Sequence, residues 1–142
     1  MTQEEKELLL KDICGRLPYD LIVQETFQNA KRDVPVWDCG PHYIKDHPEK
    51  VKPYLRPMSS MTEEEASDMF NMMFPKSRIL SLEIKNDRVT FAKVDAEENF
   101  GHITLFFNKI YSLEQIDWLN ARHFDYRSLI PMGLALEAPE NC

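Results

Sequence analysis

The sequence predicts a small α+β protein, and three observations carry that prediction. Three segments begin with a helix-capping pattern and continue with apolar residues at helical spacing. The segments between them alternate apolar and polar residues, as antiparallel strands with one solvated face do. Hydrophobic residues make up 43% of the 142 residues, enough to offset the entropy of ordering the chain. We therefore expect a small antiparallel sheet, with a barrel-like first half as an alternative, covered by about three helices.

Each predicted helix begins at a capping box. In this motif the hydroxyl of the N-cap residue accepts a hydrogen bond from the N3 amide, and the side chain of an N3 Glu or Gln accepts one from the N-cap amide. The helices are expected over residues 3–14, 63–74 and 113–122. Gly15 is expected to supply the left-handed exit of the first helix. Pro75 ends the second, because proline has no amide to continue it. The capping pairs are Thr2 with Glu5, Thr62 with Glu65, and Ser112 with Gln115.

Strands are predicted in the intervals between the helices. Leu80, Leu82 and Ile84 alternate with polar residues, and residues 103–107 repeat that alternation. With the segment 89–94 between them, they predict a three-stranded antiparallel meander over residues 79–107. In the first half of the chain, residues 21–27 are predicted to form a strand, and 34–37 and 50–54 are weaker strand candidates. Residues 29–33 and 38–48 are expected to be loops.

The length predicts a single domain over residues 1–142, without a second independent core. The tail after about residue 137 has little to bury, so we expect it to be flexible. The acidic start of the chain is unlike a secretory signal, and three cysteines without framework spacing indicate reduced thiols. We therefore expect a cytoplasmic location.

The formal net charge of −7 disfavours nucleic acid as a partner, because an acidic surface repels phosphate backbones. The longest apolar runs are far shorter than the roughly 20 residues that cross a bilayer, so no membrane association is expected. Glycine is too scarce for a phosphate-cradling loop, and no cofactor is predicted. Nucleic-acid binding would require six basic residues to gather on one face: Lys31, Arg32, Lys45, Lys50, Lys52 and Arg56.

Three stretches of the chain carry a resemblance. They read LLLKDICGRLPY at residues 8–19, VKPYLRPMSSMTEEE at residues 51–65, and IDWLNARHFDYRSLIPMGLALEAPE at residues 116–140. Together they resemble a family of small proteins of unknown function that recurs in gut Bacteroidetes genomes, commonly in their phages and integrated elements. The resemblance implies a setting rather than a reaction, and it supplies no catalytic residues.

The most metal-like segment contains Cys39, His42 and His47. Cysteine and histidine are zinc ligands, and the spacing Cys39-x-x-His42 would place two of them around one ion. No second pair follows at finger-like spacing, and Cys14 would join only if the fold brought it near. A polar loop with a Gly-Pro turn explains the same residues, and we predict no metal site.

Titratable and aromatic groups gather directly after the third predicted helix. A hydrogen bond between His123 and Asp125 would provide a general base, although no activated nucleophile accompanies it. In the structural alternative, His123 interacts with the helix C-terminus and Asp125 pairs with Arg122 or Arg127, while the neighbouring aromatic rings pack.

The function predicted from these observations is non-enzymatic, phage- or mobile-element-linked, and exercised by binding another protein; a small hydrolase or metal-dependent enzyme is the alternative. We expect an exposed apolar or aromatic patch that includes Trp37, Trp118 or Tyr126. Arg56 lies in a proline-bounded segment and is either an anchor for an anion or peptide, or part of a rigid connector. The candidate binding residues are Trp118, His123, Asp125, Tyr126, Arg127 and Arg56.

Overall fold

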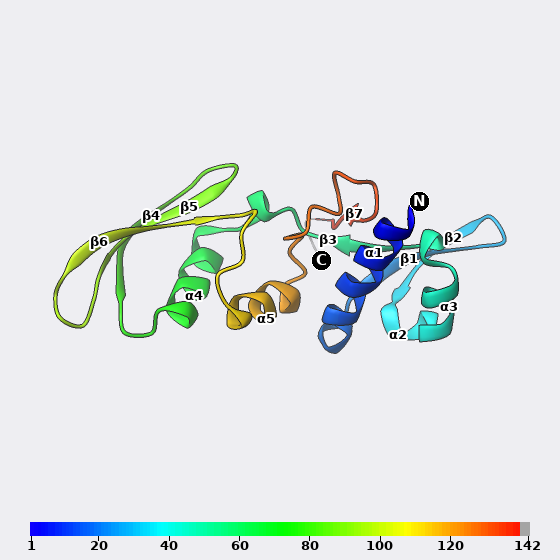
Figure 1. The fold of residues 1–142 in the computed structure, drawn as a ribbon, viewed down its shortest axis with the longest axis horizontal. Helices are drawn as coiled ribbons and strands as arrows, with labels where there is room; N and C mark the ends of the chain where they lie inside the picture. The colour runs from blue at the N-terminus through cyan, green and yellow to red at the C-terminus, as the bar shows by residue number, and fades with distance from the viewer. Residues whose placement is uncertain (140–142) are drawn as a thin grey trace.

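The computed structural model describes residues 1–139 and shows two lobes side by side along the long axis of the molecule (Figure 1). The α+β class predicted from the sequence is confirmed. The helices are α1 (Gln3–Arg16), α2 (Val36–Cys39), α3 (Pro41–Asp46), α4 (Glu63–Met73) and α5 (Leu113–Ala121). The strands are β1 (Ile22–Phe27), β2 (Ala30–Pro35), β3 (Val51–Leu55), β4 (Arg78–Ile84), β5 (Arg88–Val94), β6 (Phe100–Phe106) and β7 (Leu136–Glu137).

The first lobe contains a four-stranded sheet in the order β2-β1-β3-β7, packed against α1, α2 and α3. All pairings are antiparallel except β3 with β7, which is parallel. Over the described residues this sheet is open, so the barrel-like alternative is wrong. Residue Ala138 still donates its amide to the Leu55 carbonyl at 2.8 Å. The rest of the predicted flexible tail, from residue 140 on, lies outside the described residues.

The second lobe is the predicted meander, and its order β4-β5-β6 is confirmed. One face of this sheet packs against α4 and α5, because Val89, Phe91 and Leu105 point inward and meet Phe70 of α4. The alternation predicted the buried face of β6 correctly. In β4 it was wrong at Leu80, because the pairing with β5 shifts register between Ile79 and Ser81. As a result Ile79, Leu82 and Ile84 pack against the core and Leu80 is 49% exposed.

The buried apolar side chains form two clusters, one in each lobe. The sequence predicted one core, but the structure has two. The reason is that the two sheets lie end to end and do not stack face to face as layers around a common core (Figure 1). The two lobes connect around Arg56 and Phe124, and this boundary is called the seam below. The assignment of residues 1–142 to a single domain stays a prediction.

The predicted helix starts are confirmed. Thr2 and Thr62 form complete capping boxes. Ser112 accepts from the Gln115 amide, but the Gln115 side chain accepts from the Tyr111 amide at 2.7 Å instead of completing the box.

Two local predictions are wrong in the first lobe. Residues 29–33 were expected to form a loop, but β2 pairs with β1 along its whole length. Gln28 and Asn29 have φ values of 51° and 65°, the left-handed pair that closes a tight hairpin. Because β2 is an edge strand whose first four residues are exposed, no alternation of apolar residues marks it.

The strand candidate at residues 34–37 is correct at 34 and 35, which belong to β2, but short helices replace its end and most of the loop expected over residues 38–48. Val36 begins α2 and Pro41 begins α3, where its missing amide costs no hydrogen bond. Gly15 lies inside α1, and the left-handed residue is Asp20, with φ 52°, after a 3-10 turn at Leu17–Tyr19.

Candidate functional site

The predicted candidate residues converge on the seam between the lobes. The chain crosses this seam twice, near Arg56 and near Phe124, and the two crossings pair as a short parallel bridge. The Arg56 amide donates to the His123 carbonyl at 2.8 Å, and the Asp125 amide donates to the Arg56 carbonyl at 2.7 Å. These backbone bonds hold the two crossings together.

A buried charge network closes the seam on the side of α1. Arg16 and Asp12 are both 0% exposed, and two hydrogen bonds of 2.9 and 3.1 Å join their side chains. Arg16 also donates to the Phe124 carbonyl at 2.6 Å, and Arg127 donates to the Asp12 carboxylate at 2.8 Å. The predicted site residue Arg127 is therefore a structural partner of Asp12 and does not pair with Asp125.

His123 and Asp125 do not form the general-base pair that their spacing suggested. Both carboxylate oxygens of Asp125 accept backbone amides, from Leu129 at 2.8 Å and Ile130 at 2.9 Å. Burial raises the pKa of Asp125, although these amides oppose the increase. His123 Nδ1 is buried without a partner among the described residues, and burial, followed by the charge of Arg16, lowers the pKa of His123. The arrangement makes Asp125 a turn-forming residue.

Trp118 and Tyr126 belong to the core rather than to an exposed patch, with 7% and 9% of their surfaces exposed. The Tyr126 hydroxyl donates to Asn120 at 2.8 Å and accepts from Arg127 at 2.8 Å. The prediction of an exposed patch at these two aromatic residues is wrong, because Trp118 points inward from α5 and Tyr126, in the segment after α5, packs into the same second core.

Four side chains stack across the seam. Trp118 and Phe124 lie parallel, with ring centroids 5.8 Å apart and an interplanar angle of 7°. The Arg122 guanidinium lies 4.0 Å from the Trp118 ring centroid, and that of Arg56 lies 4.3 Å from the Phe124 centroid. Arg56 also binds both carboxylate oxygens of Glu65, at 2.6 and 2.7 Å. Of the two predicted roles for Arg56, the structure favours the rigid connector.

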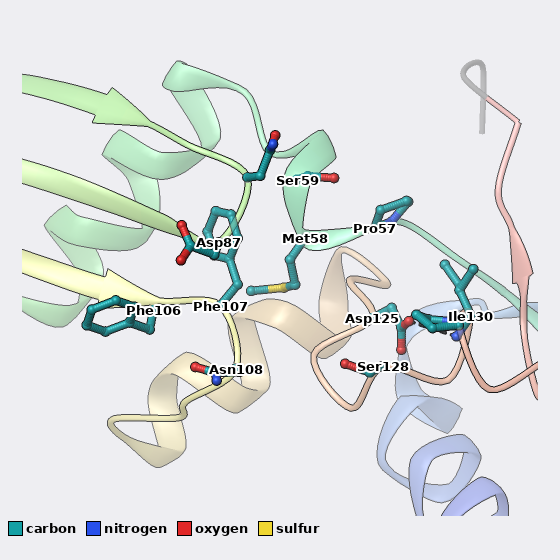
Figure 2. A pocket seen from close by; sticks show the side chains of 12 residues that line it. Pro57, Met58, Ser59, Asp87, Phe106, Phe107, Asn108, Asp125, Ser128 and Ile130 are labelled. Atoms are coloured by element: carbon teal, nitrogen blue, oxygen red, sulfur yellow. Dashed lines mark hydrogen bonds between the residues drawn. The ribbon is translucent and has the colours of Figure 1, made fainter.

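Two of the cavities along the seam are lined by predicted candidate residues besides Arg56. One, of about 340 Å³, has Asp125 and Ser128 on one side and Asp87 and Phe107 on the other, with Met58 extending between them (Figure 2). The other, of about 470 Å³, lies against the outer face of the first sheet. The residues that line this second cavity are Asp20, Ile22, Asp33, Tyr54, Arg56, Ala121, Arg122, His123, Ala138 and Pro139.

The metal-like residues of the first lobe are not gathered around a common point. The Cys39 thiol donates to Glu25 at 2.8 Å, and burial together with this carboxylate raises its pKa to about 12. His42 is exposed, and His47 packs against Tyr43 with ring centroids 5.1 Å apart. Within residues 1–139, no group of three His, Cys, Asp or Glu side chains could hold a metal ion.

An apolar groove of about 540 Å³ runs between α1 and the short helices α2 and α3. Trp37 stands at its edge with 68% of its surface exposed, and Leu17 and Cys14 are also exposed. The sequence pointed to Trp37 but missed the other residues, because a helical pattern does not tell which apolar positions a neighbouring element leaves open. The lining comprises Leu10, Ile13, Cys14, Leu17, Val36, Trp37, Ile44 and Lys45.

No helix in the described part of the chain has the length and apolar character that spanning a membrane requires. Comparison with protein-family models, with curated proteins and with solved structures yielded no match to this chain.

Proposed function

We propose that the protein acts by binding another protein through the apolar groove of the first lobe, without catalysing a reaction. The exposed Trp37 beside this groove carries the proposal. An exposed tryptophan costs hydration free energy in the free protein, and tryptophan is among the residues that contribute most at interfaces. The resemblance of the three stretches supports a setting in a phage or integrated element of gut Bacteroidetes.

The shape and apolar lining of the groove suit the binding of a helix. Leu10 and Cys14 of α1 and Leu17, which directly follows it, recur at helical spacing, and α2 with α3 forms the opposite wall. A third helix laid between two walls of this kind buries its own apolar stripe against both. The occupant we propose is an amphipathic helix of a partner protein.

The charges around the groove indicate which charged residues the polar face of the partner helix should carry. The lining itself contains one charged residue, Lys45. Near the groove, Glu7 lies two helical turns before Cys14 on the same face of α1, and Asp38 follows Trp37, so two exposed carboxylates outweigh this ammonium. With a formal net charge of −7 the whole protein attracts cations and repels anions. A helix with lysine or arginine beside its apolar stripe therefore fits the groove better than an acidic one.

The cytoplasm is the proposed compartment, and reduced cysteines support it. Within the described residues, Cys14 and Cys39 are free thiols. Nucleic acid is the less favoured partner because Arg32 and Arg56, two of the basic residues it would use, are bound to the carboxylates of Glu25 and Glu65.

The test uses a fluorescein-labelled model helix with leucines on one face and lysines on the other, titrated in a polarisation assay. A peptide of the same composition in scrambled order controls for charge alone. We expect Trp37→Ala to weaken binding at least about tenfold, and Phe100→Ala, which removes an exposed aromatic residue of the other lobe, to have no effect. Equal affinity for the two peptides, or unchanged affinity of Trp37→Ala, would contradict the proposal.

A further inference from the structure

We infer that the 470 Å³ cavity at the seam binds a small zwitterion with an apolar body, whose carboxylate is held by Arg122 and whose ammonium is held by Asp20. This site is separate from the groove on the first lobe and does not depend on the function proposed for it. A free apolar amino acid and a short apolar peptide share the required chemistry.

Arg122 is positioned to bind a carboxylate. Its guanidinium is held 4.0 Å from the Trp118 ring centroid, and its one side-chain hydrogen bond within residues 1–139, to the Trp118 carbonyl, is long at 3.4 Å. No carboxylate of residues 1–139 pairs with it. A half-buried, stacked guanidinium with unused donors presents the planar fork that carboxylates bind with two hydrogen bonds.

Asp20 supplies the complementary charge on the same cavity. It ends the 3-10 turn after α1 in the left-handed conformation, and no side-chain hydrogen bond or ion pair engages it within the described residues. Its charge is close enough to His123, the neighbour of Arg122, to act on that imidazole. Asp20 and Arg122 both line this cavity, and no ion pair joins them within the described residues.

The other charged groups of the cavity are already engaged. Glu65 binds Arg56 through both carboxylate oxygens, and Asp33 accepts from the Tyr54 hydroxyl at 2.7 Å. Burial keeps His123 from adding a positive charge at neutral pH. The Tyr54 hydroxyl leaves the charge of Asp33 in place. Within the described residues, Arg122 is the arginine of the cavity without a carboxylate partner, and Asp20 is its carboxylate without a hydrogen bond.

The rest of the lining suits an apolar ligand body. Ile22 of the sheet, Ala121 of α5, and Ala138 with Pro139 after β7 surround the space between the charges. A volume of about 470 Å³ lies within the range of about 300–1,000 Å³ typical of small-molecule sites, which are mostly apolar with a few polar groups.

The test is a titration followed by backbone amide NMR with five probes: L-leucine, L-phenylalanine, the dipeptide Leu-Leu, N-acetyl-leucine and leucinamide. The last two lack the ammonium and the carboxylate, respectively. We expect at least one zwitterion to shift the amides of Ala121–His123 and Ile22, and each blocked compound to bind at least about tenfold more weakly. Comparison of leucine with Leu-Leu distinguishes an amino acid from a peptide ligand.

Variants test whether binding depends on the charges of Arg122 and Asp20. Arg122→Gln and Asp20→Asn are each expected to weaken binding at least about tenfold. Asn tolerates the left-handed backbone of residue 20, so Asp20→Asn keeps the test valid if Arg122→Gln perturbs the fold. Arg88→Gln removes a guanidinium near the Phe106 ring of the other lobe and is expected to change nothing. Absence of shifts with every zwitterion at about 10 mM, or equal binding by Asp20→Asn, would overturn the inference.

Discussion

Replacement of Asp12 with alanine is expected to destabilise the protein by about 3–5 kcal/mol, the cost of breaking a buried ion pair by removing one partner. Asp12 accepts two hydrogen bonds from Arg16 and one from Arg127. Without it, the fully buried Arg16 keeps one acceptor among the described residues, the Phe124 carbonyl. Arg127 is partly exposed and can turn to water, so Arg16 accounts for most of the loss.

The magnitude is large against a total stability of about 5–15 kcal/mol for a typical domain, so urea denaturation measures it readily. The double variant Asp12→Ala, Arg16→Met removes the buried charge as well as its partner and is expected to recover part of the loss. The exposed Asp38→Ala is the matched control, with an expected change within about 0.5 kcal/mol.

Two outcomes would refute this reasoning. A loss below about 1 kcal/mol for Asp12→Ala would place the pair in the class of solvated surface pairs. A double variant no more stable than the single one would show that the unpaired charge of Arg16 is not the cause. Far-UV circular dichroism and the fluorescence of Trp118 in a Trp37→Phe background, in which the buried tryptophan of the second lobe alone emits, also test whether both lobes unfold in one transition.

Three further outcomes are expected. An alkylating reagent at neutral pH labels the exposed Cys14 but not Cys39, whose pKa burial and Glu25 raise to about 12; peptide mass mapping that finds both labelled in the native protein would contradict this. Burial and Arg16 lower the pKa of His123, so the unfolded chain takes up a proton near the ordinary value of 6.5 before the folded protein does. Stability therefore falls as pH drops below 6.5, and denaturation of His123→Asn at neutral and mildly acidic pH should show a smaller decrease than the wild type. Thr62→Ala removes the cap of α4 and should lower the urea midpoint by the equivalent of about 1 kcal/mol; an unchanged midpoint would show that the cap is dispensable.

Elements whose signal is local were predicted well. The capping boxes at Thr2 and Thr62 and the alternation in β6 depend on neighbours a few residues away, so the sequence contains both partners. The alternation in β4 is interrupted by a shift in its pairing with β5, which the sequence of β4 alone does not show. β2 was missed because an exposed edge strand is defined by its pairing with β1, and its own residues show no apolar face.

The candidate site was predicted less well, because its contacts join distant segments. Asp12 and Arg16 stand at helical i, i+4 spacing, so a pair between them could have been expected from the sequence. Their burial was not predictable, since it depends on Phe124, which lies 108 residues after Arg16 in the chain. In the same way, His123 and Asp125 are close in sequence but have different surroundings at the seam. Asp125 accepts the Leu129 amide, and His123 is buried near Arg16.

The sequence by itself determined the α+β class, the starts of three helices and the meander of the second lobe, because these depend on short-range hydrogen bonds and on periodic burial. The tertiary structure alone decided that two cores form, that Trp118 is buried while Trp37 is exposed, and that Arg122 and Asp20 line one cavity. The physical reason is that burial is a property of what packs against a side chain, and that neighbour is supplied by a remote part of the chain.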